Sequence, residues 1–360
     1  MNVGLRTGVL PFYLLVISIS IFAQPKSSDS GRRLTLDVVV TNNSGKAVEG
    51  LGEQDFSVFE NDHPLKIASW HAVGGQTASG AADQTKLPTT EPPLKVILVV
   101  DEVNSSFSKV THERAEIRKF LLQNNAKLTY PLSIVFFGND GIEVQNSSSL
   151  DGNSWLTAFD KHLTALRAVN KTSGLSGEVE RFRLGSNTLR SLATKQIQTP
   201  GRKIMIWISP GWPVLSDSSI DVTSKTEDAL FASILSTSTA LRQARITLYN
   251  IEHLDQEDGT LMLFLYRGFL KPVAVAKKAL PGDLALQVLA EQSGGLVLDA
   301  SEDLSVLINH CIDDASVSYT IAVDLPPTGK PEEYHDIEVK TRQPGLTTRT
   351  RKGYYTQPNL

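Results

Sequence analysis

The residues best suited to chemistry follow an apolar run in "KVILVVDEVNSSFS", residues 95–108. Asp101 ends the run, and Ser105 follows it among other hydroxyl and amide side chains. A strand-end carboxylate followed by hydroxyls offers the oxygen ligands that hard cations such as Mg²⁺ or Mn²⁺ prefer. The stretch therefore either holds a metal ion that grips a ligand, or is a turn that serves only the fold.

The elements that must position Asp101 begin near residue 94, where short apolar segments alternate with amphipathic ones. The pattern predicts strands at 94–100, 132–138, 203–209, 245–251 and 295–300, and helices at 111–125, 187–197, 226–244 and 284–294. Near-continuous apolar runs are typical of parallel strands covered on both faces. We therefore expect a doubly wound, mostly parallel α/β sheet flanked by helices, in a domain spanning 94–316. Ligands bind such sheets at the carboxyl ends of the strands, where Asp101 lies.

The flanking segments have a different character. Residues 33–73 alternate like strands and turns and predict a small β-rich N-terminal module. Residues 74–93 are rich in Gly, Pro, Thr and Ala and predict a linker. Residues 317–356 follow a helix and predict β-rich C-terminal strands. Those strands either extend the central sheet or pair with the N-terminal module, and the sequence leaves both arrangements open.

The first 23 residues are typical of a signal peptide. Arg6 supplies the positive charge, an apolar core runs from Val9 to Phe22, and Ala23 offers a small residue for cleavage. A membrane anchor is the alternative, but the run is shorter than the ~20 residues that span a bilayer. Cys311 is the only cysteine, which excludes an internal disulfide. We expect an exported protein, periplasmic or extracellular, with no membrane span after cleavage.

Composition and motifs argue against several classes of function. The net charge of −4 is unlike that of a general nucleic-acid binder. The seven histidines never fall in a zinc-site spacing, and no strand is followed by a Gly-rich phosphate loop with its lysine. The segment "SGLSGE" at 173–178 does not fit a nucleophile elbow. The sequence therefore predicts a non-enzymatic protein without catalytic residues.

Several long segments carry a resemblance to a known family. They include "LDVVVTNNSGKAVEGLGEQDFSVFEND", "VDEVNSS", "TPGRKIMIWISPGWP" and "LAEQSGGLVLDASEDL". In this order they resemble the von Willebrand factor A domain, and more closely the exported VWFA-related domain proteins of acidobacteria. The resemblance implies the fold of that domain and an export route. It also implies a metal-ion-dependent adhesion site, built from Asp-x-Ser-x-Ser, a Thr from a middle loop and an Asp after a later strand.

Carried onto this chain, the adhesion site is degenerate. Asp101 matches the first ligand, Ser105 the second serine, and Ser186 of "RLGSNTLRSL" the threonine, with Thr188 as the other register. Val103 and Pro210 stand where a serine and the second carboxylate belong. One interpretation is a weak Mg²⁺ or Mn²⁺ site. In the other, Asp101 accepts hydrogen bonds from loop amides while Ser105 and Ser186 cap the helices that follow.

Asn104 and Trp212 are the predicted contacts for a partner. An exposed Trp212 would anchor that partner, whereas a buried one would close the core. The leading hypothesis is a binding or adhesion module that engages a protein or cell-envelope partner through loops at the strand ends. The alternative is a structural or scaffold protein of the cell envelope with an inactive metal site. The tail "TTRTRKGYY" predicts an edge strand whose Arg349, Arg351 and Lys352 face water.

Overall fold

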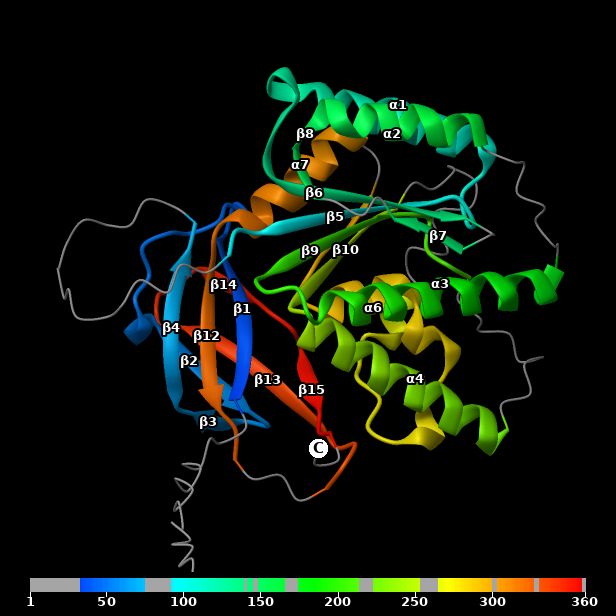
Figure 1. Cartoon of the computed structure of the whole chain (residues 1–360). Coiled ribbons are helices and arrows are strands. Elements are labelled where there is room, and N and C mark those ends of the chain that lie inside the picture. Colours follow the sequence, from blue (N-terminus) through cyan, green and yellow to red (C-terminus); the bar gives the residue numbers. More distant parts are fainter. Residues whose placement is uncertain are drawn as a thin grey trace, which may run out of the picture.

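The computed structural model describes residues 33–74, 92–138, 141–144, 148–165, 174–213, 223–252, 265–299, 303–326 and 330–357. The predicted signal peptide at 1–23 lies outside these residues, as does most of the predicted linker at 74–93. Figure 1 shows an α/β part and an all-β part that lie against each other. No helix within the described ranges is long and apolar enough to cross a membrane.

A mostly parallel sheet forms the centre of the α/β part. Its strands are ordered β11-β10-β9-β5-β6-β7, and β8 also pairs with β6. Neighbours from β11 to β6 are parallel, whereas β7 and β8 run antiparallel to β6. The strand bounds are β5 Lys95–Asp101, β6 Lys127–Gly138, β7 Gly141–Val144, β8 Ser149–Asp151, β9 Lys203–Ile208, β10 Ile246–Glu252 and β11 Val297–Asp299.

Helices cover both faces of this sheet, which confirms the predicted doubly wound α/β class. On one face lie α1 (Phe107–Ala126), α2 (Gly152–Ala165) and α7 (Leu304–Ser316), and on the other α3 (Gly174–Gln196), α4 (Ser224–Gln243) and α6 (Leu286–Gln292) (Figure 1). Each face has its own hydrophobic core. Short 3₁₀ turns η2 (Tyr266–Phe269), η3 (Ala276–Lys278) and η4 (Pro281–Leu284) precede α6.

The β-rich segments at the two ends of the chain form one sandwich of two four-stranded sheets, ordered β14-β1-β12-β4 and β15-β13-β2-β3. The strands are β1 Arg33–Asn42, β2 Phe56–Glu60, β3 His63–Leu65, β4 Ile67–Val73, β12 Ser318–Asp324, β13 Tyr334–Thr341, β14 Leu346–Arg349 and β15 Gly353–Tyr355, with a 3₁₀ turn η1 at Glu53–Asp55. The C-terminal strands therefore pair with the N-terminal module. This answers the question that the sequence left open.

Alternation of side chains explains how the sandwich closes. Leu34, Leu36 and Val38 of β1 are buried at every second position, as a strand with one face on a core requires. They pack with Tyr319 and other residues of both sheets. Apolar side chains from segments about 280 residues apart thus share one core, so neither end of the chain could bury its strands alone.

Polar contacts join the two parts. Asp37 of β1 forms an ion pair with Arg245, at 2.5 Å between Oδ1 and Nη2. The Tyr355 hydroxyl donates to the Val273 carbonyl oxygen at 2.9 Å. Arg349 pairs with Asp314 of α7, and Arg351 is only 9% exposed. The prediction that Arg349 and Arg351 face water is therefore wrong, because Arg351 is buried and Arg349 is half-buried against Asp314, whereas Lys352 is exposed.

Candidate functional site at the strand ends

Asp101 is the centre of a buried hydrogen-bond network. It is fully buried at the end of β5. Its Oδ1 accepts the backbone N–H groups of Val103 (3.0 Å) and Asn104 (2.9 Å). Its Oδ2 accepts the side chains of Asn104 (2.9 Å), Ser209 (2.8 Å) and Trp207 (3.2 Å). A carboxylate has about four lone-pair sites, and five donors already converge on these two oxygens.

The electrostatics at Asp101 follow from burial and hydrogen bonding. Burial raises the pKa of the Asp101 carboxyl, because a low-dielectric surrounding disfavours the charged form. The bonds from Asn104, Ser209 and Trp207 oppose this by stabilising the carboxylate. Burial is the larger effect, so the pKa of Asp101 stays above its ordinary value.

Ser105 does not have the capping role that the sequence predicted. It is 2% exposed, and its hydroxyl has no hydrogen-bond partner in the structure. The neighbouring Ser106 caps α1 instead, accepting the Lys109 backbone N–H at 3.4 Å. Val103, at the position of the missing serine, is buried in the core between the sheet and α3. Only one hydroxyl of the motif therefore remains near Asp101.

Ser186 lies in the middle of α3, not in a loop. Its hydroxyl donates to the Arg183 carbonyl oxygen at 3.3 Å, one turn earlier in the same helix. The prediction that Ser186 caps a helix is therefore wrong, and its role as a metal ligand stays a prediction. A hydroxyl inside a helix can bond to a preceding carbonyl group without interrupting the helix, and no contact between Ser186 and Asp101 is present among the described residues.

Trp212 is a core residue. It is 2% exposed, its indole N–H donates to the Leu284 carbonyl oxygen at 2.8 Å, and its ring meets that of Trp207 edge to face at 5.4 Å between centroids. Its role as a partner anchor is therefore wrong. Asn104 is half-buried, and both its backbone and side-chain N–H groups bind Asp101. It belongs to the internal network.

The sequence did not single out Ser209 and Asn250. The Ser209 hydroxyl donates to Asp101 and accepts the Gly211 N–H at 3.0 Å. The Asn250 side chain donates to the carbonyl oxygens of Trp207 (3.1 Å) and Ser209 (3.0 Å). Ser209 is the last residue of the strand predicted at 203–209, and that strand-end position is the signal that could have found it.

A second buried carboxylate lies at the end of β10, the strand next to β9. Glu252, the last residue of β10, is buried and accepts the side-chain amide of Gln287 at 2.7 Å. The same amide of Gln287 lies 3.3 Å from the Pro210 carbonyl oxygen. Burial raises the pKa of Glu252, which the Gln287 bond partly offsets. Gln287 therefore ties α6 to the ends of β9 and β10.

Two acidic residues near Asp101, Glu102 and Glu113, differ in whether a partner stabilises their negative charge. Glu102 forms a buried ion pair with Arg114 of α1, at 2.6 Å. Glu113, also on α1, is fully buried, and neither of its carboxyl oxygens has a hydrogen-bond partner in the structure. Burial, with the nearby Asp101 charge, raises the pKa of Glu113 to about 8. A neutral Glu113 carboxyl at pH 7 is the consequence.

These side chains do not fit a divalent cation. Within the described ranges, no group of three or more His, Cys, Asp or Glu side chains is placed to hold a metal. Asp101 has its oxygens occupied by donors, and Ser105 offers a single hydroxyl. Affinity for a hard cation depends on the number and charge of free oxygen ligands. The strand ends are arranged as a hydrogen-bonded support for the fold.

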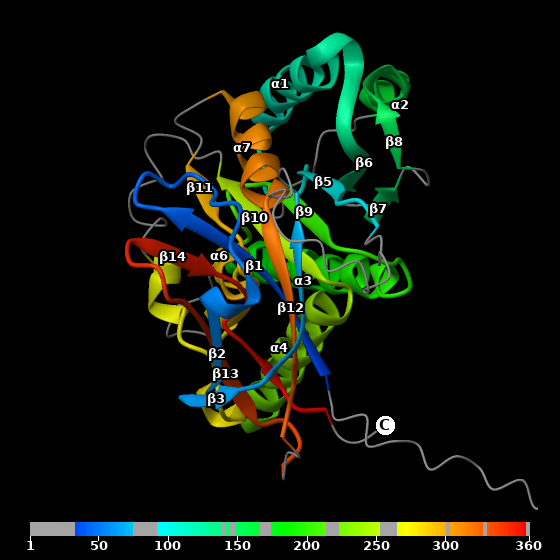
Figure 2. The same cartoon turned by 90° about the vertical axis from the view of Figure 1, so that its left-hand side faces the viewer.

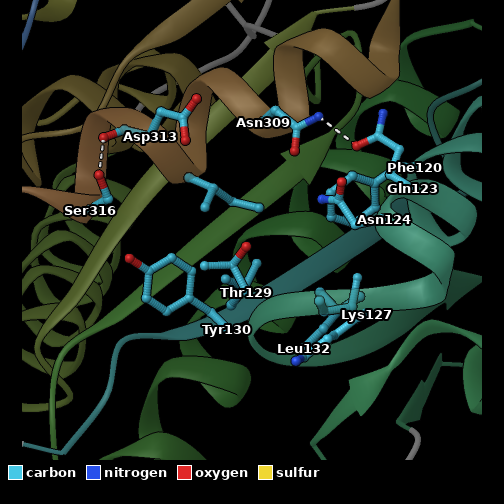
Figure 3. Close-up of a pocket in the computed structure, with 13 residues that line it drawn as sticks. Phe120, Gln123, Asn124, Lys127, Thr129, Tyr130, Leu132, Asn309, Asp313 and Ser316 are labelled. Carbon is cyan, nitrogen blue, oxygen red and sulfur yellow. Dashed lines mark hydrogen bonds between the residues drawn. The ribbon is translucent and has the colours of Figure 1, made fainter.

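The described residues also line a cavity of about 220 Å³ between α1, α7 and the start of β6. Figure 3 shows Asn309 of α7 facing Gln123 of α1, joined by a hydrogen bond of 2.8 Å. Phe120, Leu132 and Ile312 supply apolar surface, and Thr129 and Tyr130 lie beside them. The lining also includes Lys127, Asp313 and Ser316, and the Ser316 hydroxyl donates to the Asp313 backbone carbonyl oxygen at 2.7 Å.

Comparisons with known proteins find similar solved structures at low identity. No protein-family model matches the chain, and no curated protein matches its sequence. The chain is similar to the solved SpRpn10 VWA domain (TM-score 0.30, 12% identity, covering 61% of this chain and 95% of that one). It is also similar to the manganese-loaded TRAP protein of Plasmodium vivax (0.35, 11%, 71% and 92%) and to a point mutant of the PilB minor pilin from Streptococcus sanguinis (0.35, 10%, 78% and 78%). The strand order itself shows a mixed α/β fold with a mostly parallel sheet.

Proposed function

We propose that this protein is an exported, non-enzymatic binding or scaffold module that engages a protein or cell-envelope partner without a metal ion at the strand ends. The saturation of both Asp101 oxygens by five donors carries the proposal. The burial of Trp212 removes the aromatic anchor that the sequence offered to a partner at that face. The alternative from the same class is adhesion through a metal-bound strand-end site, as the family resemblance implies.

Calorimetric titration with MnCl₂ and MgCl₂ tests the metal-free part of this proposal. We expect no saturable heat up to about millimolar metal, the range of weak oxygen-ligand sites. Ser105→Ala is the matched variant, because this hydroxyl makes no hydrogen bond and its loss leaves the Asp101 network intact. Saturable binding that disappears in Ser105→Ala would establish the metal site and overturn the proposal.

Binding itself is tested with isolated cell-envelope fractions as the probe. The purified protein is expected to sediment with envelopes equally well in the presence and absence of EDTA, and as the Ser105→Ala variant. Loss of sedimentation with EDTA would favour metal-dependent adhesion. If the protein never sediments with envelopes, the binding hypothesis fails.

Export is tested by mass spectrometry of the secreted or periplasmic protein. The apolar core from Val9 to Phe22 and the small Ala23 predict cleavage after residue 23. A mature protein beginning at Gln24 is the expected result. Retention of the complete leader in a membrane fraction would instead indicate an anchor.

A further inference from the structure

Arg351 is a buried cation at the junction of the two parts of the molecule. It lies between β14 and β15, where the chain passes from the sandwich to α4 and α6 (Figure 1). The Arg349 side chain donates to the Gly294 carbonyl oxygen at 2.9 Å, and the Lys352 backbone N–H donates to that of Gln292 at 3.0 Å, so the backbone here is firmly held. Arg351 is only 9% exposed, yet its guanidinium makes no hydrogen bond or ion pair with the described residues. A buried charge of this kind is strongly destabilising unless another group neutralises it.

The charges around Arg351 do not neutralise it. Asp37 of β1 attracts it, but Asp37 already accepts two bonds from Arg245, at 2.5 Å from Nη2 and 3.3 Å from Nε. Arg242, in the last turn of α4, repels it; Figure 2, in which the sandwich faces the viewer, shows α4 behind the sandwich. Burial, and then this repulsion, lower the pKa of Arg351 to about 10, so the guanidinium stays charged at pH 7. Arg351 therefore lacks a counter-ion of its own within the described part of the chain.

The Tyr334 hydroxyl is a second donor beside Arg351. Burial raises the pKa of this hydroxyl and the nearby Arg351 charge opposes the increase, which places the two side chains close together. The hydroxyl makes no hydrogen bond with the described residues, and it lies over Gly353, where a Cβ would be 2.3 Å from the Tyr334 oxygen. The Tyr334 ring is held by an edge contact with Tyr355, at 5.1 Å between centroids. Asp336, whose charge also acts on Tyr334, is exposed to solvent. Arg351 and Tyr334 thus present N–H and O–H donors in one place.

We propose that Arg351 and the Tyr334 hydroxyl bind a small free oxyanion, of the size and charge of inorganic phosphate, at the junction of the sandwich and α4. A guanidinium offers two parallel N–H donors to two oxygens of such an anion, and the Tyr334 hydroxyl donates to a third. The anion supplies to Arg351 the negative charge that Asp37 gives to Arg245. Because Arg351 is almost completely buried, a small ion reaches it, whereas a phosphate group carried by a lipid or a polymer is too bulky. This inference does not rest on the proposed envelope partner.

Calorimetric titration of the purified protein with sodium phosphate, at constant ionic strength, tests the site. We expect saturable binding with a Kd of about 0.1–10 mM, the range for a small ion held by a few charge-assisted bonds. Arg351→Met removes the charge and keeps an unbranched side chain, so it should weaken binding about tenfold or more. Tyr334→Phe removes one donor and should weaken binding by about threefold to tenfold. Lys352→Met is the matched control, because it removes a positive charge at the exposed neighbouring position and should leave phosphate binding unchanged.

Thermal unfolding separates anion binding from a purely structural role of Arg351. Without phosphate, Arg351→Met should unfold at the same or a higher temperature than the unmodified protein, because it removes a buried charge that lacks a partner. Phosphate at about ten times its Kd should raise the unfolding temperature of the unmodified protein by a few degrees and leave that of Arg351→Met unchanged. NaCl at the same ionic strength is the control for general screening.

Two results would overturn the proposal. One is the absence of saturable binding to the unmodified protein up to about 100 mM phosphate, ten times the weakest expected Kd. The other is phosphate binding that survives Arg351→Met, which would place the anion elsewhere on the molecule.

Discussion

The carboxylate of Asp101 and the hydroxyl of Ser105 lie four residues apart, yet they have different relations to the fold. Asp101 satisfies donors from its own loop and from Trp207 and Ser209 of the neighbouring strand end. Ser105 is buried without a hydrogen bond. A cation site would require a carboxylate oxygen of Asp101 and the hydroxyl of Ser105 to face one point. Here Asp101 makes hydrogen bonds to protein groups, and Ser105 makes none. The motif is best explained as a support for the turn after β5.

This difference predicts opposite outcomes for two substitutions. Asp101→Asn replaces one acceptor oxygen with an amide N–H that faces existing donors, so it should lower the free energy of unfolding by about 2–4 kcal/mol. Ser105→Ala removes a hydroxyl that has no partner, so it should leave stability unchanged or slightly higher. Urea denaturation of both variants measures this. Equal losses in the two variants would contradict the structural role assigned to Asp101.

Glu113 predicts a pH dependence of stability. Its pKa of about 8 in the folded protein lies above the value of 4.5 for an exposed glutamate, so the folded state holds the proton more tightly. Its stabilising contribution is complete below about pH 4.5 and is lost as the pH rises to about 8, a change of ~3 kcal/mol between pH 5 and 8. Glu113→Gln should remove this slope and be the more stable protein at pH 8.

Denaturant unfolding at a series of pH values, compared for the unmodified protein and Glu113→Gln, measures the slope. Glu180→Gln is the control, because Glu180 is exposed on α3. The same pH slope in the unmodified protein and in Glu113→Gln would show that Glu113 is not the group responsible.

Among the elements, the five central parallel strands were predicted close to their observed bounds because their apolar runs are nearly continuous. The sequence segment around Ser186 was expected to be a loop and is part of α3, which begins at Gly174. Helix α2 was not predicted. Its residues, together with the long first half of α3, carry mixed polar and apolar side chains whose helical state depends on packing against the sheet. Local sequence patterns therefore predicted the strands of the sheet better than the helices that cover it.

The contact between α3 and Trp212 predicts a sensitive position. A Cβ on Gly185 would lie 2.5 Å from the Trp212 ring, which is closer than packing allows. Gly185→Ala favours the helix by ~1 kcal/mol intrinsically, but the clash should make it destabilising by about 1–3 kcal/mol. Gly268→Ala is the control, since no atom lies within 4 Å of its Cβ position. A more stable Gly185→Ala protein would contradict this packing.

For the whole molecule, the sequence could predict a β-rich segment at each end but not that the two form one sandwich. Strand pairing between residues about 280 apart leaves no local pattern, because each strand alternates in the same way whichever partner it has. The same applies to the candidate site. Asp101 was found from its place at a strand end. Three of its five donors come from Val103 and Asn104 directly after it, whereas Trp207 and Ser209 belong to β9 and the turn that follows, and only the folded sheet brings these two to Asp101.

The α/β part lies in the chain between the N-terminal and C-terminal strands of the sandwich. We therefore expect the two parts to unfold together. Arg245 follows α4 and pairs with Asp37 of β1, with side chains 24% and 12% exposed. Arg245→Met keeps an unbranched stem but leaves the Asp37 carboxylate without its cation, so we expect a loss of about 1–3 kcal/mol. Far-ultraviolet circular dichroism follows the described α-helices, which lie in the α/β part, and hydrogen exchange of β1 and β12 follows the sandwich. If the two transitions coincide and Arg245→Met shifts both equally, the two parts form one cooperative unit. A sandwich that unfolds separately from the helices in the unmodified protein would contradict this prediction.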